Sequence, residues 1–196
     1  QWQAVARLGE AAAIDPTVVR HDGRWWLFYA LAGPDDRAMR ELHAAWAETL
    51  TGPWTPHTGN PVMRGLDVSR PGGTAFVQDG AVHLPVQDCA AAYGVAINLL
   101  RIDALSPQTF AASTVRRFEP GDLSPGFSDG LHTLSGLGGV TCIDVKAERR
   151  SAVEPWLKAS FKLRRLLGLN GPRGRRATGA VAYPEMFTAS PGRKED

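Results

Sequence analysis

The sequence predicts an all-β fold, and three observations lead to that expectation. The 196 residues include 21 Gly and 14 Pro, which separate short apolar runs as they do where tight turns join strands. Two Asp-Gly dipeptides, Asp22-Gly23 and Asp79-Gly80, stand between such runs and are typical of two-residue hairpin turns. Units of similar pattern start at Asp15-Pro16, Arg70-Pro71 and His132, about 55–60 residues apart, which is near the length of a large β-propeller blade.

The first unit, residues 14–62, is expected to form one antiparallel sheet. Its first strand carries a carboxylate, Asp15, at the inner end, and a propeller blade delivers polar side chains to a central cavity in this way. A third strand is expected at Arg40–Ala47, facing partly outward, although Ala and Glu there favour a helix. The other expected segments are a strand including Val18–Val19, a strand over Trp25–Ala32, a polar loop over 34–39 and a loop from Gly52-Pro53-Trp54 to Asn60-Pro61-Val62.

The second and third units follow the same scheme. Strands are expected over Thr74–Gln78, Ala81–Pro85, Val95–Ile102, Phe110–Phe118, Gly130–Ser135 and Val140–Lys146, with a turn over Asp103–Thr109. Residues 1–10 are expected to be the end of a strand from a preceding blade. About two and a half blades are thus predicted. A closed propeller needs at least four, so the chain is expected to be the C-terminal half of one.

The composition changes after Val145, and two regions are predicted: incomplete propeller blades over 1–146 and a basic tail over 147–196. Residues 156–167 place Trp156, Ser160 and Leu163 near one helical face, which predicts a short basic amphipathic helix ending at Gly168. From Asn170 onward Gly, Pro, Arg and Ser predict disorder. Such a helix suits weak contact with an anionic membrane surface, and a solvated end is the alternative.

The net charge of +2 hides an asymmetry. Residues 146–196 hold twelve Lys/Arg and five Asp/Glu, whereas residues 1–145 hold ten and fifteen. A mildly acidic body argues against a core that binds nucleic acid. A cavity lined by carboxylates suits neutral sugars or cations better than phosphates.

Several features bear on the compartment. No apolar stretch approaches the roughly 20 residues that span a bilayer, and no signal peptide is visible at Gln1-Trp2-Gln3-Ala4. Cys89 and Cys142 are too few for a disulfide framework, and two buried, reduced thiols are expected, with a single bridge as the alternative. A cytoplasmic location is therefore expected.

The motifs occur together, in the same order, in a known family. The chain resembles the N-terminal domain of plant glucosamine inositolphosphorylceramide transferase and its bacterial relatives, some of which are fused to formyltransferase-like modules. The resemblance covers roughly residues 5–146 and implies a five-bladed β-propeller similar to arabinanase, invertase and levansucrase glycosidases. In the plant enzyme, sugar transfer belongs to a separate domain without a counterpart here. The matching motifs are Asp15-Pro16, Trp25–Phe28, Gly52-Pro53-Trp54, His57, Asn60-Pro61-Val62, Arg70–Gly73, Gln87-Asp88-Cys89, Tyr93-Gly94 and Gly130–Thr133.

Asp15 and Asp88 are the candidate catalytic residues. Propeller glycosidases aim carboxylates from successive blades at one sugar, and hydrolysis needs an acid together with a base or nucleophile roughly 5–9.5 Å apart. Asp15 could instead hydrogen-bond backbone amides at a strand start. Asp88 could instead form a structural ion pair with Arg70.

Arg70, Gln87, His132 and Trp54 are the candidate substrate-binding residues. Arg70 stands before Pro71 and two glycines that allow close approach of a ligand. His132 offers a proton or a hydrogen bond to a sugar, or is a satisfied structural histidine. Trp54 offers a stacking surface, with core packing as the alternative. No metal site and no cofactor are expected.

Two functions remain open. The first is a carbohydrate-active propeller module that binds, and hydrolyses or transfers, a glycosyl group at its axial cavity; its partner would be a carbohydrate or a nucleotide- or lipid-linked sugar. The second is a non-catalytic module, which binds glycans or acts as a scaffold beside a glycosyl- or formyltransferase. They differ in whether two carboxylates face each other across the cavity.

Overall fold

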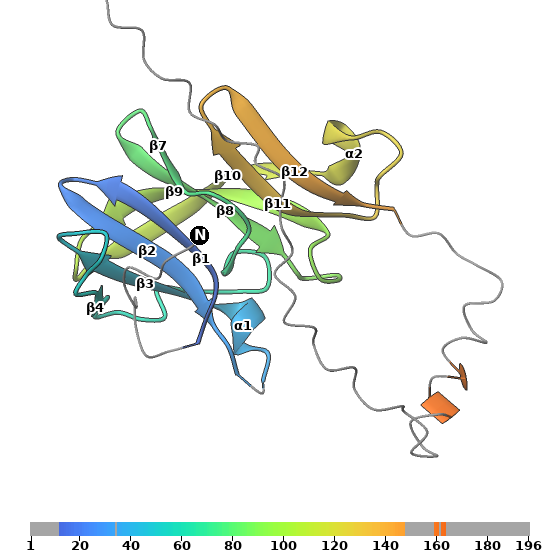
Figure 1. The fold of residues 1–196 in the computed structure, drawn as a ribbon, viewed down its shortest axis with the longest axis horizontal. Helices are drawn as coiled ribbons and strands as arrows, with labels where there is room; N and C mark the ends of the chain where they lie inside the picture. Colours follow the sequence, from blue (N-terminus) through green and yellow to red (C-terminus); the bar gives the residue numbers. More distant parts are fainter. Residues whose placement is uncertain (1–11, 34, 148–158, 161, 164–196) are drawn as a thin grey trace, which may run out of the picture. The chain divides into compact units, whose positions relative to one another are not determined.

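The computed structural model describes residues 12–33, 35–147, 159–160 and 162–163 (Figure 1). The chain divides into two units, Gln1–Glu148 and Arg149–Asp196. The first unit is mostly β, as predicted. In the second, the described residues 159–160 and 162–163 are helical. The rest of the predicted 156–167 helix, the predicted disorder and the predicted strand over 1–10 lie outside the described residues.

The first sheet is antiparallel, and its hairpin turn is as predicted. Its strands are β1 (Ala13–His21), β2 (Arg24–Leu31), β3 (Glu41–Ala47), β4 (Thr55–Pro56) and β5 (Met63–Arg64), in the order β1-β2-β3-β4 with β5 also paired to β3. Asp22 and Gly23 both have positive φ, 47° and 77°, as the tightest hairpin turn requires. A short helix, α1 (Arg37–Arg40), precedes β3.

The β3 strand is confirmed, but the expectation that it faces partly outward is wrong. It lies between β2 on one side and β4 and β5 on the other. Leu42 and Ala44 face the core and are fully buried. On the other face His43 stacks on Tyr29, with ring centroids 5.6 Å apart. Neighbours on both faces and both edges therefore bury the strand.

The second sheet has the same kind of turn at Asp79 and Gly80, whose φ angles are 51° and 74°. Two strands, β8 (Ala81–Asp88) and β9 (Ala96–Leu105), are longer than predicted, and β7 (Phe76–Gln78) begins later than predicted. A short helix, α2 (Pro120–Leu123), was not predicted. The strands are β6 (Arg70–Pro71), β7 (Phe76–Gln78), β8 (Ala81–Asp88), β9 (Ala96–Leu105) and β10 (Phe110–Phe118), in the order β10-β9-β8-β6 with β7 also paired to β8.

A third element is the hairpin of β11 (Gly130–Leu137) and β12 (Val140–Lys146). It joins the second sheet through a parallel bridge between Gly73 and Leu134. The approach is close: a Cβ at Gly73 would lie 1.7 Å from the Leu134 carbonyl oxygen, and φ there is +155°. Only glycine fits at this junction.

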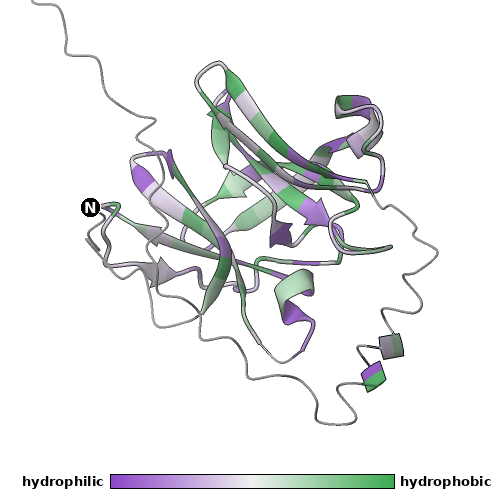
Figure 2. Ribbon diagram, turned by 45° about the vertical axis from the view of Figure 1, so that its right-hand side comes forward, coloured by the Kyte–Doolittle hydropathy of each residue, from purple (hydrophilic) through white to green (hydrophobic). Residues whose placement is uncertain are grey.

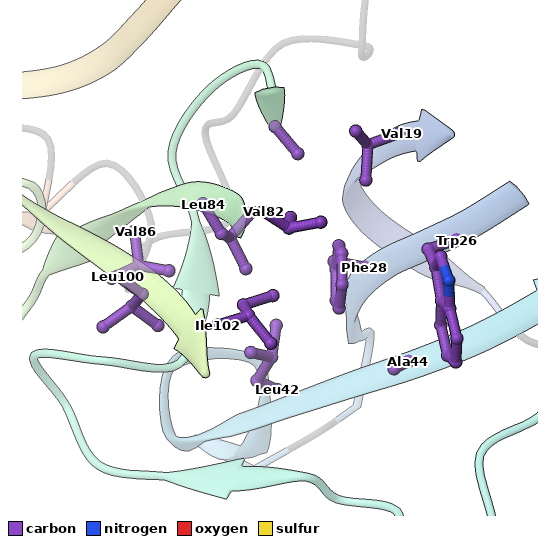
Figure 3. Close-up of a cluster of buried hydrophobic side chains, with 11 residues drawn as sticks. Val19, Trp26, Phe28, Leu42, Ala44, Val82, Leu84, Val86, Leu100 and Ile102 are labelled. Carbon is purple, nitrogen blue, oxygen red and sulfur yellow. The ribbon is translucent and has the colours of Figure 1, made fainter. Parts of the chain in front are cut away.

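The main core lies between the first two sheets (Figure 3). Phe28 of β2 and Leu42 of β3 face Leu84 of β8 and Ile102 of β9, and all four are buried. Core residues alternate along each strand, as a pleated strand requires, and Figure 2 shows apolar and polar segments interleaved on the strands. The other members of the core are Val19, Trp26, Ala44, Ala75, Val82, Val86 and Leu100.

The two cysteines are free, and they differ in exposure. Cys89 is buried, and burial raises the pKa of its thiol. Cys142 is exposed on β12, so the expectation that both thiols are buried is wrong. The reason is that β12 pairs with β11 alone among the described strands, and most of its residues are exposed within the described part of the chain. In the part of the chain that the structure describes, no helix has the length and apolar character to cross a bilayer.

Candidate functional site

The strand at the start of each of the three sequence repeats is irregular, and each irregularity contains a candidate residue. In β1 the register slips between Ile14 and Thr17, and Asp15 takes a left-handed backbone conformation, φ 48°. Between β6 and β7 the strand is broken after Arg70-Pro71. In β11 the register slips between Leu131 and Thr133, which leaves His132 as the extra residue. Bulges of this kind re-aim a side chain.

Asp15, Arg70 and Gln87 meet at one point. The Arg70 Nε donates to Asp15 Oδ2 over 2.8 Å. Gln87 Nε2 donates to the same oxygen over 3.3 Å and to the Pro71 carbonyl over 3.1 Å. The Arg70 side chain is 12% exposed and that of Asp15 is 40% exposed. The Arg70–Asp15 ion pair thus joins the second sheet to the first. Its guanidinium is largely buried, whereas its carboxylate is partly exposed to solvent.

A second group, Tyr93, His132 and Asp144, adjoins the first. The Arg70 guanidinium lies over the Tyr93 ring, 5.0 Å from its centroid. The Tyr93 hydroxyl lies 2.9 Å from His132 Nε2, and His132 Nδ1 lies 2.5 Å from Asp144 Oδ2. In the tautomer that is protonated at Nδ1, the carboxylate accepts from Nδ1–H and Nε2 accepts from the tyrosine hydroxyl.

Two small hollows flank His132. The first has a volume of about 250 Å³ and is lined by Asp15, Pro16, Thr17, Pro71, Gly72, Gly73, Thr74, Gln87, His132, Thr133 and Ser135. We call it the Asp15 hollow. The second, of about 220 Å³, is lined by Tyr93, Gly94, Gly130, His132, Asp144, Val145 and Lys146. Three of the predicted residues, Asp15, Gln87 and His132, therefore share one hollow, with Arg70 bound to Asp15.

Asp88 does not join them, and the expected Arg70–Asp88 pair does not form. β8 pairs with β9 in unbroken register, so Gln87 and Asp88 point to opposite faces of the sheet. Asp88 is buried, pairs with Arg117 of β10 and accepts from the Ala90 backbone N–H over 2.8 Å. Both partners belong to the second sheet and its adjoining loop, so the geometry gives this carboxylate a structural environment.

Trp54 lies at neither hollow. It precedes β4, which, like β5, pairs with β3 on the side of the first sheet away from β1 and Asp15. Its side chain is half-buried, and Nε1 is enclosed without a hydrogen-bond partner among the described residues. The structure therefore separates Trp54 from the other predicted binding residues.

The loop around Trp54 has a backbone role that explains several of its residues. Asn60 accepts from the Ala44 N–H and donates to the Ala44 carbonyl, each over 2.8 Å. Its amide thereby fills the gap in the strand ladder between β4 and β5. His57 Nδ1 accepts from the Gly59 N–H over 2.9 Å. The loop completes the outer edge of the first sheet.

The two side chains that are bonded to His132, Tyr93 and Asp144, both have shifted pKa values. Burial raises the pKa of the Tyr93 hydroxyl, and the Asp15 charge adds to this while the Arg70 charge and the Gln87 amide oppose it. For Asp144, burial acts to raise the pKa, but hydrogen bonds and charge from His132 outweigh it, so the pKa is lowered. Asp144 is thus held ionised beside the imidazole.

Tyr93 and Asp144 are the site residues that sequence reasoning missed. Tyr93 belonged to a recognised motif but carried no assigned role. Asp144 lies opposite the His132 bulge because β11 and β12 pair across a Gly-rich turn. Aligning the two predicted strands across that turn would have placed them together. Among the described residues, no three His, Cys, Asp or Glu side chains are arranged to hold a metal ion.

Comparison with solved structures gives low similarity. A family 117 glycoside hydrolase from Zobellia galactanivorans is 17% identical, covering 70% of this chain and 40% of that one, with a TM-score of 0.45. An α-L-arabinofuranosidase from Clostridium thermocellum is 16% identical, covering 71% and 44%, with a TM-score of 0.41. At such TM-scores these likenesses carry no argument about the present chain.

Comparison of sequences is decisive for the family. A glucosamine inositolphosphorylceramide transferase 1 from Oryza sativa subsp. indica is 33% identical over 116 residues, and one from Arabidopsis thaliana is 30% identical over 112. The match covers 56% of this chain and 15% of each of these relatives. The family described as glucosamine inositolphosphorylceramide transferase 1, N-terminal, matches residues 1–119. The chain therefore belongs to this N-terminal domain family, as its motifs predicted.

Proposed function

We propose that the Asp15 hollow binds a glycosyl group and that the domain acts as a glycan-binding module. The observation that carries the proposal is the convergence of Asp15, Gln87 and His132, from three separate strands, on one hollow of about 250 Å³. A carboxylate, an amide and the hydroxyls of Thr17, Thr133 and Ser135 are groups that exchange hydrogen bonds with sugar hydroxyls. The name of the sequence relatives, glucosamine inositolphosphorylceramide transferase 1, includes a sugar, which agrees with such a ligand.

Binding is favoured over hydrolysis because of where the carboxylates lie. Hydrolysis needs two carboxyl groups on either side of the scissile bond. Asp88, the expected second carboxylate, faces away and is paired with Arg117. Asp144 lines the neighbouring hollow and is bonded to His132. The described residues thus provide a binding surface without the opposed pair. In this proposal the two sheets and the β11–β12 hairpin are blades of half of a five-bladed propeller, and the hollow lies near its axis.

The test is calorimetric titration of the full chain with a panel of monosaccharide methyl glycosides, supported by a glycan array. Asp15→Asn keeps the size of the side chain but removes its charge, and is expected to weaken binding about tenfold because hydrogen bonds to charged groups are the stronger ones. Asp103→Asn is the matched control, since Asp103 belongs to an ion pair with Arg101 and lines neither hollow. Affinity that is equal in both variants and the wild type would remove the hollow from consideration.

A further inference from the structure

Gln87 lines the Asp15 hollow and carries a buried polar atom that has no hydrogen-bond partner among the described residues. Its side chain is 2% exposed, and Oε1 has no hydrogen-bond partner among the described residues. The orientation of the amide is fixed by chemistry: the other end faces Asp15 Oδ2 and the Pro71 carbonyl, which are both acceptors, so that end must be the donor NH₂. The atom left over is an acceptor.

A buried acceptor without a partner is costly, and such atoms are satisfied by solvent or by a ligand. Among the described residues, three other buried side-chain atoms lack a hydrogen-bond partner: His43 Nε2, Trp54 Nε1 and His57 Nε2. None of their residues lines either hollow. Gln87 is therefore the residue at which an unmet hydrogen bond and a space for a ligand coincide.

The charges around the hollow are already paired with one another. Arg70 is bonded to Asp15 and covered by Tyr93. His132 is engaged at both ring nitrogens, by Tyr93 and Asp144. The residues that line the Asp15 hollow include no Lys or Arg. A ligand anion would thus meet the carboxylate of Asp15 and the carbonyl oxygen of Gln87 without a free cation to balance it.

We propose, resting on the function above, that the hollow selects a sugar without an acidic group, one of whose hydroxyls donates to Gln87 Oε1, and that it discriminates against acidic sugars. A hydroxyl supplies the missing donor and replaces solvent at no loss of hydrogen bonds. A carboxylate on the sugar is acceptor-only and faces two further acceptors. Gln87 is in this view the residue that determines specificity.

The first experiment needs no variant. The full chain is titrated with matched pairs of methyl glycosides, glucoside against glucuronide and galactoside against galacturonide. At least one neutral member is expected to bind about tenfold or more tightly than its acidic partner, as expected when a site built for a donor meets a ligand that lacks one. Equal binding, or tighter binding of the uronide, overturns the specificity while leaving the glycan-binding function in place. Absence of binding to any sugar refutes the function itself.

The second experiment assigns the contact to Gln87. Gln87→Met keeps the length of the side chain but lacks the acceptor, and Gln108→Met is the control, because Gln108 is exposed in a turn. The neutral sugar that binds is retested as each of its monodeoxy analogues. One analogue is expected to lose about tenfold on the wild type and nothing further on Gln87→Met, which is the coupling of a shared hydrogen bond. Equal losses on both proteins for every analogue overturn the proposal. If Gln87→Met does not fold, the neutral-against-acidic comparison on the wild type decides.

Discussion

Two regions of the first unit carry family motifs but use their polar groups in opposite ways. The outer edge is the loop from Gly52 to Val62 beside β4 and β5, and the inner edge is the group of residues that line the Asp15 hollow. At the outer edge, both the oxygen and the NH₂ of the Asn60 amide are hydrogen-bonded to the backbone of Ala44. At the inner edge, Gln87 has the same functional group, but only its NH₂ end is bonded, and its oxygen is enclosed without a partner among the described residues in a residue that lines the Asp15 hollow. The amide at the outer edge completes a sheet, whereas the one at the inner edge is incomplete without a ligand.

This contrast shows that a motif shared with a family does not by itself mark a binding site. The residues from Gly52 to Val62 were as useful for recognising the family as Arg70–Gly73, yet they close the ladder between β4 and β5. What separates the two groups is the state of their hydrogen bonds in the folded chain. Four changes test or sharpen the contrast.

The largest effect is expected for Gly73→Ala at the inner edge. The new Cβ would clash with the Leu134 carbonyl, so the junction between the second sheet and the β11–β12 hairpin must open. A loss of about 3 kcal/mol or more in the free energy of unfolding is expected, together with loss of the hollow. Urea denaturation measures it. Gly139→Ala is the control, since nothing lies within 4 Å of a Cβ there; similar stability of the two variants would contradict the junction described above.

Asn60→Ala should produce the next largest loss, at the outer edge. Two hydrogen bonds disappear, and the Ala44 N–H loses its partner while the Ala44 carbonyl keeps the bond from the His57 N–H. The expected cost is about 2 kcal/mol of unfolding free energy. Binding of the neutral sugar by the folded protein should not change. Thr58→Ala, which removes an exposed hydroxyl from the same loop, serves as the control. A change in affinity for Asn60→Ala would mean that the outer edge takes part in recognition.

Asp88→Asn separates two neighbouring residues of β8. It removes the charge that pairs with Arg117, and about 1–2 kcal/mol of stability should be lost, since one partner of the pair is partly exposed. Sugar affinity should stay at the wild-type value, in contrast to Gln87→Met. Calorimetry and denaturation of the same samples provide both quantities. Loss of binding without loss of stability would restore Asp88 as a ligand-binding residue.

The smallest effect is a pH dependence from His43 in β3. Burial lowers the pKa of its imidazole below the ordinary 6.5, against an opposing effect of Glu41. The unfolded chain therefore takes up a proton near pH 6.5 that the folded chain refuses, and stability is lost as pH falls from about 6.5 through the folded pKa. The slope from one such group is at most about 1.4 kcal/mol per pH unit. His43→Gln should flatten the stability profile between pH 7 and 5; an unchanged profile would assign the slope to other groups.

Much of the fold could be predicted from local patterns. The hairpins at Asp22-Gly23 and Asp79-Gly80 were predicted because the dipeptide itself favours positive φ at both positions. The strand Phe110–Phe118 was predicted with its observed bounds. The prediction that β3 faces partly outward was wrong, because the burial of this strand depends on strands that pair with it from other parts of the chain. The ends of β8 and β9 were missed because pairing continued beyond the local pattern.

The site was predictable only in part. The recurring position of Asp15, Arg70 and His132 in successive units indicated that they converge, and the structure brings them together. The partners were not predictable: Arg70 joins Asp15 rather than Asp88 because β8 turns Gln87, not Asp88, toward them. Which of two adjacent polar residues faces the hollow depends on strand register, and the Gln87-Asp88 dipeptide does not specify it.

That dependence has an evolutionary side. Inserting or deleting one residue within Ala81–Asp88 would shift the register of the end of β8 by one residue. The side chains of Gln87 and Asp88 would then exchange faces of the sheet. The Asp88 carboxylate would then stand beside that of Asp15, and the amide would meet the guanidinium of Arg117. Lineages of this domain are therefore expected to tolerate length changes in the β9–β10 turn far more readily than in β8, since a single-codon indel in β8 would add a second negative charge at the place where the ligand is proposed to bind.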